Sequence, residues 1–512
     1  MSSKIISLPY DIIYLISDFI GFNSKNLKDF FNTTKKLMYF KRNICYWNLN
    51  REYSPYYVYD EDITLINNTV NFKNYINNLV ENPRNQLSLD FSRYTYNNTT
   101  TDDDFITNNL DKLNLAFCNI KFDIYNFNNI RELILRGCKN LVDVNPLANI
   151  ENLDLSFCDN LKDVNPLHKV KDLNLSNCKN VMDVSNLGSV RFLNLSGCNI
   201  SNVDNLTNVY HLNISFCDFI YDISKLTNVI ILNISNCNNI RDINNLEKVI
   251  DLDMSNCNNI RDIRSLTSLK KLDISNCINI LDIDDNIKNT LTNLSYINMS
   301  EFKNNINLNL LSHINTVILS NYDKIIDLSQ LYTVKKLDLS YCNKICNINS
   351  LSNIHTLLLA YTNIEDVTPF ANVHTLNLTN CKNLKNISSL KNVNTLILAG
   401  CNIKNSDIIE LFNVYKLDLS HCNNITDVRP LKNIPILNLS YCKNLYDITP
   451  LKNVKNLNIS GCTYIDLNKN TLDTLNRIHT LDISYSNIRN IKYLKDVYSL
   501  KYIDNSDYEY FI

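Results

Sequence analysis

A period of about twenty residues runs through most of this 512-residue chain and constrains its fold more than any other feature. The pattern Leu-x-Leu-Ser-x-Cys returns at Cys158, Cys178 and Cys198, and it continues after one step of nineteen residues at Cys217. The register persists from about residue 111 to about residue 500, which corresponds to about nineteen repeats. A repeat of this length cannot bury its apolar face alone, so the repeats must stack into a solenoid.

Each repeat divides into a strand and a return path. The Leu-x-Leu segment alternates apolar and polar residues, which is typical of a short strand with Leu173 and Leu175 pointing inward. The second half is too short for a full helix, and Pro166 favours an extended path or a tight turn there. The acid that precedes it, as at Asp143, Asp163 and Asp427, is expected to cap the turn by accepting backbone N–H groups.

The cysteines mark the bend after each strand. Cysteine is small, weakly polar and usually buried, so it suits an inward-turning position. The same position is occupied by Phe302, Tyr322, Thr362 and Ser486 in other repeats, a tolerance that a metal array would not show. Cys342 and Cys346 form the one close pair in the sequence, and no second pair completes a zinc site. The sequence therefore predicts structural, reduced thiols and no metal.

Several features favour the cytoplasm or nucleus. Asp11 and Asp18 interrupt the N-terminal apolar run, whose apolar residues recur at helical spacing, so we expect an amphipathic helix rather than a signal peptide. Asn-x-Ser occurs in strand after strand, as at Asn174, where glycans on a secreted protein would obstruct the sheet. The net charge of −2 argues against a nucleic-acid partner, and no apolar run is long enough to cross a membrane.

Catalytic chemistry finds no support in the sequence. His355 and His374 lie at the same place in adjacent repeats and should be close in space, but a zinc site would need further ligands. We find no glycine-rich phosphate loop, no nucleophile elbow and no Cys-His pairing outside the repeat register. We therefore predict that the chain is not an enzyme and holds no cofactor.

Variation between repeats points to recognition of another protein. The residue between the two leucines is nearly always Asn or Asp and the residue after the second is nearly always Ser, which are scaffold choices. The residue before each cysteine varies and is often aromatic, and exposed aromatics on a rigid sheet are typical of binding hot spots. Packing of these side chains on their neighbours along the sheet is the alternative. The predicted target-binding residues are Phe117, Phe157, Phe192, Phe216, Ile231, Tyr341, Tyr361, His421, Tyr441 and Tyr485.

From about residue 111 to 500 the sequence resembles the cysteine-containing class of the leucine-rich repeat family. The resemblance implies an α/β repeat solenoid, a horseshoe with one parallel sheet on its concave side. Residues 1–50 resemble an F-box, a small all-α module, on the strength of Leu8-Pro9, the helical pattern through Ile20 and Trp47. Residues 51–110 are expected to form a helical connector and N-terminal cap, with Leu87 and Leu89 in a degenerate strand, and residues 501–512 a C-terminal cap.

The F-box resemblance implies a partner. In that family the Leu-Pro pair and the apolar helix face bind the Skp adaptor of a cullin ubiquitin ligase. The segment Asn32–Leu37 departs from the usual pattern because it lacks the family's tryptophan, which puts the strength of adaptor binding in doubt. The residues that the resemblance assigns to adaptor binding are Leu8, Pro9, Ile12, Ile13, Leu15, Ile16 and Ile20.

Together these features predict a non-catalytic substrate-recognition subunit of an SCF-type ubiquitin ligase, monomeric outside the complex, whose repeats bind a target protein. The composition is similar to that of F-box and repeat proteins of giant DNA viruses or AT-rich protists, which would place the chain in a host cell if it is viral. The alternatives are a leucine-rich repeat scaffold or inhibitor without a ubiquitin link, its N-terminus only a cap, and a secreted adhesion protein similar to internalins.

Overall fold

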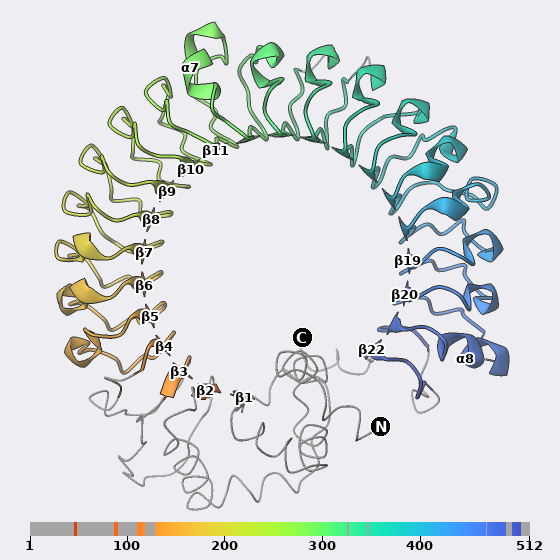
Figure 1. The fold of residues 1–512 in the computed structure, drawn as a ribbon, viewed down its shortest axis with the longest axis horizontal. Helices are drawn as coiled ribbons and strands as arrows, with labels where there is room; N and C mark the ends of the chain where they lie inside the picture. The colour runs from red at the N-terminus through yellow and green to blue at the C-terminus, as the bar shows by residue number, and fades with distance from the viewer. Residues whose placement is uncertain are drawn as a thin grey trace, which may run out of the picture. The chain divides into compact units, whose positions relative to one another are not determined.

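The computed structural model describes residues 46–48, 87–90, 110–117, 127, 130–324, 327–345, 348–466, 468–487 and 494–502. The chain divides into two compact parts, Met1–Asn239 (the N-terminal part) and Ile240–Ile512 (the C-terminal part). In both, the strands lie on the inner side of the stacked repeats and the short helices on the outer side (Figure 1). None of the helices in the described ranges is long and apolar enough to span a membrane.

The strands of the N-terminal part pair in parallel, each with the strand of the next repeat. From Glu132–Ile134 to Ile231–Asn233, the central residue of each strand is a leucine that faces the core, as Leu173 does, and it stands directly opposite the equivalent leucine of the neighbouring repeat. The strands are β1 (Tyr46–Asn48), β2 (Leu87–Asp90), β3 (Leu110–Asn114), β4 (Glu132–Ile134), β5 (Asn152–Asp154), β6 (Asp172–Asn174), β7 (Phe192–Asn194), β8 (His211–Asn213) and β9 (Ile231–Asn233).

The C-terminal part continues the same parallel pairing from β10 to β22. Its strands are β10 (Asp251–Asp253), β11 (Lys271–Asp273), β12 (Tyr296–Asn298), β13 (Thr316–Ile318), β14 (Lys336–Asp338), β15 (Thr356–Leu358), β16 (Thr375–Asn377), β17 (Thr395–Ile397), β18 (Lys416–Asp418), β19 (Ile436–Asn438), β20 (Asn456–Asn458), β21 (Thr480–Asp482) and β22 (Ser499–Lys501). This arrangement confirms the predicted solenoid with a parallel sheet.

The return paths are mostly single turns of 3-10 helix, where the sequence predicted an extended path or a tight turn. Pro166 lies at the start of η3, where its missing N–H removes no helix hydrogen bond. The helices are η2 (Asn145–Leu147), η3 (Asn165–Lys169), η4 (Leu187–Ser189), η5 (Asp285–Ile287), α7 (Lys288–Leu291), η6 (Leu308–Leu311), η7 (Ser329–Leu331), η8 (Ile348–Leu351), η9 (Thr368–Phe370), η10 (Ile387–Asn392), η11 (Leu411–Asn413), η12 (Arg429–Leu431), η13 (Thr449–Leu451) and α8 (Lys469–Leu475).

Side-chain oxygens hold both bends of the repeat. At the strand end, Asn174 Oδ1 accepts a hydrogen bond from the backbone N–H of Ser176 at 3.0 Å, and the equivalent bond recurs between Asp418 and Ser420 at 2.8 Å. At the return path, Asp163 Oδ1 accepts from the N–H of Asn165 at 3.0 Å. The structure therefore confirms the predicted capping acids and explains why Asn or Asp recurs inside the strands.

The N-terminal module also differs from the expected fold in its described residues. Trp47 was assigned to an all-α module, but Tyr46–Asn48 forms a strand that pairs in parallel with β2. A backbone that extends an open sheet edge satisfies its hydrogen bonds there, which explains the strand at this point. The expected strand at Leu87 and Leu89 is confirmed as β2. The seven predicted adaptor-binding residues lie outside the described residues.

Candidate target-binding surface

The cysteines form a buried row inside the repeats and serve the scaffold. The Cys178 Sγ donates a hydrogen bond to the Leu155 carbonyl of the preceding repeat at 3.1 Å, and the equivalent bonds of other repeats measure 3.0 to 3.3 Å. Burial raises the pKa of Cys178 to about 12, so its thiol stays protonated at neutral pH. Every described cysteine is buried, which confirms the prediction of structural thiols.

The histidines are brought together as expected without gathering into a metal site. The rings of His355 and His374 stack with their centroids 4.5 Å apart and their planes 14° apart. The ring of His479 stacks on that of Tyr498 with centroids 4.7 Å apart, a pair that was not predicted. Within the described ranges, His, Cys, Asp and Glu side chains nowhere gather in threes that would hold a metal ion.

Eight of the predicted target-binding residues share one backbone position. They lie in the tight turn between the strand and the cysteine rather than in the sheet itself, where the sequence had placed them. Their φ angles are 57° to 65°, the left-handed region that residues with a side chain rarely adopt. We call these eight residues the turn aromatics: Phe117, Phe157, Phe216, Tyr341, Tyr361, His421, Tyr441 and Tyr485.

Most turn aromatics are exposed despite their apolar rings. Phe216 has the largest exposed fraction at 60%, and Tyr441, at 37%, is also classed as exposed. His421 is exposed as well, whereas Tyr485 is half-buried. Both the strained backbone and the exposed apolar ring lower the free energy of unfolding at these positions. The stability of the scaffold therefore does not explain why aromatic residues stand there.

In the N-terminal part the turn aromatics do not form one patch. Phe117 and Phe157 share the guanidinium of Arg136, whose central carbon lies 5.7 Å from the first ring and 4.7 Å from the second. The ring of Phe117 also lies over Gly137, where an added Cβ would come within 2.5 Å of it. In three successive repeats this turn position holds Gly197, Phe216 and Asn236. The Phe216 ring therefore has no aromatic residue at the same position in either neighbouring repeat.

In the C-terminal part the turn aromatics stack in pairs. The rings of Tyr341 and Tyr361 lie 4.6 Å apart with planes at 7°, and those of His421 and Tyr441 lie 4.8 Å apart with planes at 4°. Each pair joins two successive repeats, so these rings pack on one another, as the alternative interpretation expects, and still stay partly exposed.

Phe192 and Ile231 lie elsewhere, at the first position of β7 and β9, where both are half-buried. Phe192 contacts Tyr210 edge-on, with centroids 6.1 Å apart, and Arg191 lies 5.3 Å from its ring. Tyr210 and Arg191 were not predicted, because their proximity depends on the register between repeats rather than on any local pattern.

The left-handed conformation was missed, although the sequence contained a signal for it. The same turn position holds glycine at Gly137, Gly197, Gly400 and Gly461, and it holds Asn at Asn177 and five further repeats. Glycine and Asn are the residues that favour this conformation. Their recurrence in one column, alternating with aromatics, is a pattern typical of a left-handed turn.

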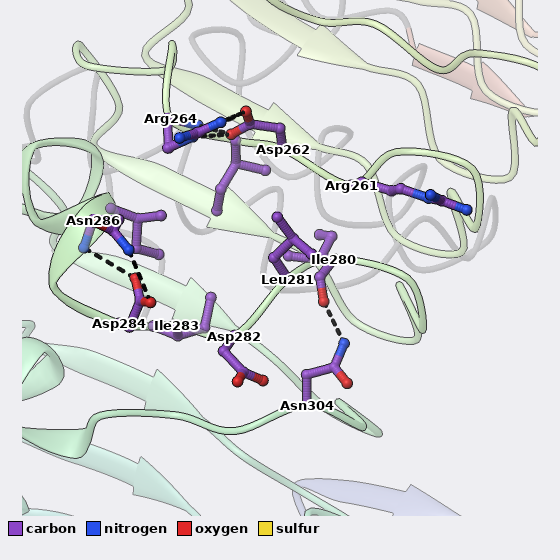
Figure 2. Close-up of a pocket in the computed structure, with 12 residues that line it drawn as sticks. Arg261, Asp262, Arg264, Ile280, Leu281, Asp282, Ile283, Asp284, Asn286 and Asn304 are labelled. Atoms are coloured by element: carbon purple, nitrogen blue, oxygen red, sulfur yellow. Dashed lines mark hydrogen bonds and ion pairs between the residues drawn. The ribbon is translucent and has the colours of Figure 1, made fainter.

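A pocket lies on the outer side of the C-terminal part, next to the longest repeat (Figure 2). It has a volume of about 410 Å³ and is lined by residues from Arg261 to Arg264 and from Ile280 to Ile287, with Asn304. Cys277 and the equivalent Phe302 are separated by twenty-five residues instead of about twenty, and the additional residues contain η5 and α7. The pocket therefore marks an insertion between repeats.

The polar groups of this pocket are engaged in holding their own turns. Asp262 accepts hydrogen bonds from the Arg264 backbone and guanidinium, which keep the pKa of its carboxyl low. Asp284 accepts from the Asn286 backbone N–H and side-chain amide, as Figure 2 shows. The lining thus has few groups left to converge on a ligand, and we assign the pocket a structural origin.

No protein-family model and no curated protein matches this sequence. Solved structures that are similar to it include an internalin of Listeria monocytogenes, 22% identical, covering 63% of this chain and 87% of that one with a TM-score of 0.37. A leucine-rich repeat protein of Leptospira interrogans is 19% identical, with coverages of 74% and 97% and a TM-score of 0.41. The mouse RP105/MD-1 complex is 15% identical, with coverages of 74% and 83% and a TM-score of 0.48. All three scores lie below 0.5, so we infer function from this chain's own residues.

Proposed function

We propose that this chain is a non-catalytic, intracellular, protein-binding solenoid whose turn aromatics contact a target protein. The observation that carries the proposal is the combination of backbone strain and exposure at one position. A residue with a Cβ in the left-handed region costs roughly 1–2 kcal/mol, and glycine or Asn relieves much of that cost elsewhere in the same column. Tyr and Phe retained there at such a cost fit a binding role, since exposed aromatics dominate the energy of many interfaces.

Two further features support an intracellular binding protein. The described cysteine thiols are buried, and they need no disulfide for their hydrogen bonds, which suits a reducing compartment. Asn174, the first residue of an Asn-x-Ser sequence, uses its side chain to hold the turn at Ser176. A glycan on the amide nitrogen of this half-buried side chain would crowd the strand end.

Replacing Phe216 with Asn should separate binding from stability. We expect the free energy of unfolding to rise by about 1 kcal/mol, because Asn relieves left-handed strain and no aromatic neighbour is lost. We expect binding of a target, identified by proximity labelling with the full chain, to weaken at least tenfold. Urea unfolding and biolayer interferometry measure the two effects.

The reverse exchange one repeat further on is the matched control. Asn236→Phe places a ring at the left-handed turn of the next repeat and should lower the free energy of unfolding by about 1 kcal/mol. When it is combined with Phe216→Asn, we expect target binding to stay weak. A target that binds Phe216→Asn, Tyr341→Asn and Tyr361→Asn as tightly as the unaltered chain would contradict the proposal.

A second candidate function, substrate recognition for an SCF-type ubiquitin ligase, rests on the F-box resemblance of residues 1–50. We propose that Leu8 and Pro9 contact a Skp-type adaptor, and that the double substitution Leu8→Ala with Pro9→Ala lowers co-purification of the adaptor with the full chain at least tenfold. The repeats should keep their circular dichroism spectrum. If the unaltered chain does not retain the adaptor, the ligase function is excluded and the scaffold function stands; equal retention by both chains would move the contact elsewhere.

A further inference from the structure

Five strands of the C-terminal part, β14 to β18, present an unusual row of side chains on their exposed face. The strand registers place the first residue of each strand opposite the first residue of the next. Lysine occupies both ends of this row and threonine the three positions between. In order across the strands, the row is Lys336, Thr356, Thr375, Thr395 and Lys416.

The two lysines carry charge that nothing in the described structure neutralises. Both are exposed, and neither ammonium group has a hydrogen-bond or ion-pair partner among the described residues. Elsewhere on the same sheet, basic residues pair with the neighbouring strand: Lys112 lies 2.5 Å from Glu132, and Lys271 lies 2.9 Å from Asp251. The β14–β18 face therefore offers two free ammonium groups at its ends.

The nearest carboxylates on these strands are already occupied. Asp338 Oδ1 accepts the backbone N–H of Ser340 at 2.9 Å. Asp418 accepts the N–H of Ser420 at 2.8 Å with one oxygen, and the side-chain amide of Asn438 at 2.9 Å with the other. Both acids hold their strand ends, and among the described residues neither forms an ion pair with Lys336 or Lys416.

Between the lysines, the face is uncharged and partly apolar. The third strand position, which holds Asp at Asp338 and Asp418, holds Leu358 and Ile397 on β15 and β17, both half-buried, with Asn377 between them. Leu and Ile cannot accept the turn hydrogen bond that Asn or Asp makes in other repeats. In these two repeats a partly exposed apolar side chain therefore takes the place of the capping Asn or Asp, which is consistent with a contact surface.

We infer that the β14–β18 face binds an extended acidic segment of a partner protein, with one carboxylate at each lysine. This inference rests on the proposed protein-binding function. Four strand spacings of about 4.8 Å place the two lysine Cα atoms about 19 Å apart. An extended chain rises about 3.3 Å per residue, so acids six residues apart span about the same distance. An even separation also puts both acids, and the alternate residues between them, on one face.

The stacking of the nearby rings favours a peptide over single-stranded nucleic acid. Bases bind such surfaces by stacking on free aromatic faces. Here Tyr341 stacks on Tyr361 and His355 stacks on His374. One face of each of these four rings is therefore covered by its partner and cannot stack on a base. Two lysines separated by three uncharged strands also make a poor track for a phosphate backbone.

The test uses synthetic peptides and the full chain. The probe is a fluorescent peptide with the core Glu-Ser-Val-Ser-Val-Ser-Glu; the comparison peptides have Gln at both ends or shorten the separation of the acids to four residues. Fluorescence anisotropy should show at least tenfold tighter binding of the probe, and the affinity should fall with added salt. The double variant Lys336→Glu with Lys416→Glu should weaken probe binding at least tenfold.

The matched control, Lys432→Glu with Lys452→Glu, makes the same charge change after η12 and η13 and should bind as the unaltered chain does. Undetectable binding of the probe, binding that ignores the separation of the acids, or equal binding by the Lys336/Lys416 variant would each overturn the inference. Preferential binding of oligouridylate over the probe would overturn it in favour of nucleic acid. If the labelled target still binds while the probe does not, this inference alone fails; if neither binds, the proposed function fails with it.

Discussion

Raising the pH from 8 to 11 in the presence of a reductant is expected to unfold the repeats. Burial raises the pKa of Cys158, Cys178, Cys198 and Cys217 to about 12, from an ordinary value near 9. The folded state therefore holds protons that the unfolded state releases, so this stability is complete below pH 9 and is lost as the pH rises toward 12. Between about pH 9 and pH 12, each thiol lowers the free energy of unfolding by about 1.4 kcal/mol per pH unit.

A few such thiols are enough to unfold the protein at high pH, because the free energy of unfolding of a domain is only about 5–15 kcal/mol. At pH 10 these four thiols together are expected to lower the free energy of unfolding by about 5–6 kcal/mol. Urea unfolding followed by circular dichroism at several pH values measures the slope.

A variant with threonine at the same four positions is the control for other alkaline effects, including tyrosine ionisation. The chain itself places threonine at this position, where the Thr362 hydroxyl donates to the Leu359 carbonyl at 2.7 Å while fully buried. We expect the slope of stability against pH to shrink by about 5–6 kcal/mol per pH unit between pH 9 and 11. An unchanged slope in the variant would show that the thiols do not control alkaline unfolding.

Replacing Leu175 with Ala should cost about 3 kcal/mol of unfolding free energy. The side chain is fully buried one residue after β6, and its removal leaves a cavity between stacked repeats that the neighbours fill only in part. Since each repeat is stabilised by its neighbours, the loss should also split the unfolding curve into separate transitions on either side of the weakened repeat. Urea unfolding monitored by circular dichroism detects both effects.

Met182 provides the control in the same repeat. Its side chain is 65% exposed, so Met182→Ala should change stability by less than about 0.5 kcal/mol. Equal losses in the two variants would mean that Leu175 is not a core residue of the interface between repeats.

Residues whose partners are local were predictable. The return-path acid at Asp163 caps a backbone N–H only two residues away, so its role is visible in any single repeat. The same holds for the alternation of Leu173 and Leu175 and for the inward cysteine, because one pattern recurs in every repeat and each copy supports the others. The stacked histidines at His355 and His374 were also predictable, since adjacent repeats place equal positions side by side.

Residues whose partners lie about one repeat away were harder to predict. The sequence indicated that Phe157 and Phe216 differ from Asn177, but not that all three share a strained left-handed turn. It also placed the aromatics on the sheet and left their packing open. The structure puts them in turns, stacks Tyr341 on Tyr361 and His421 on Tyr441, and leaves Phe216 without an aromatic residue at the same position in the neighbouring repeats. Backbone conformation and ring pairing depend on how neighbouring repeats stack, which a single repeat does not encode.

The sequence by itself determined the period, the buried leucines, the cysteine bend and the capping acids, because each is a local requirement repeated many times. Only the tertiary structure decided which exposed side chains meet. The registers that align Lys336 with Lys416 across three threonines accumulate over four strand pairings, including one step shortened from twenty residues to nineteen between Thr356 and Thr375. Stacking maintains strand register through such changes in spacing, so the surface is a property of the assembled solenoid.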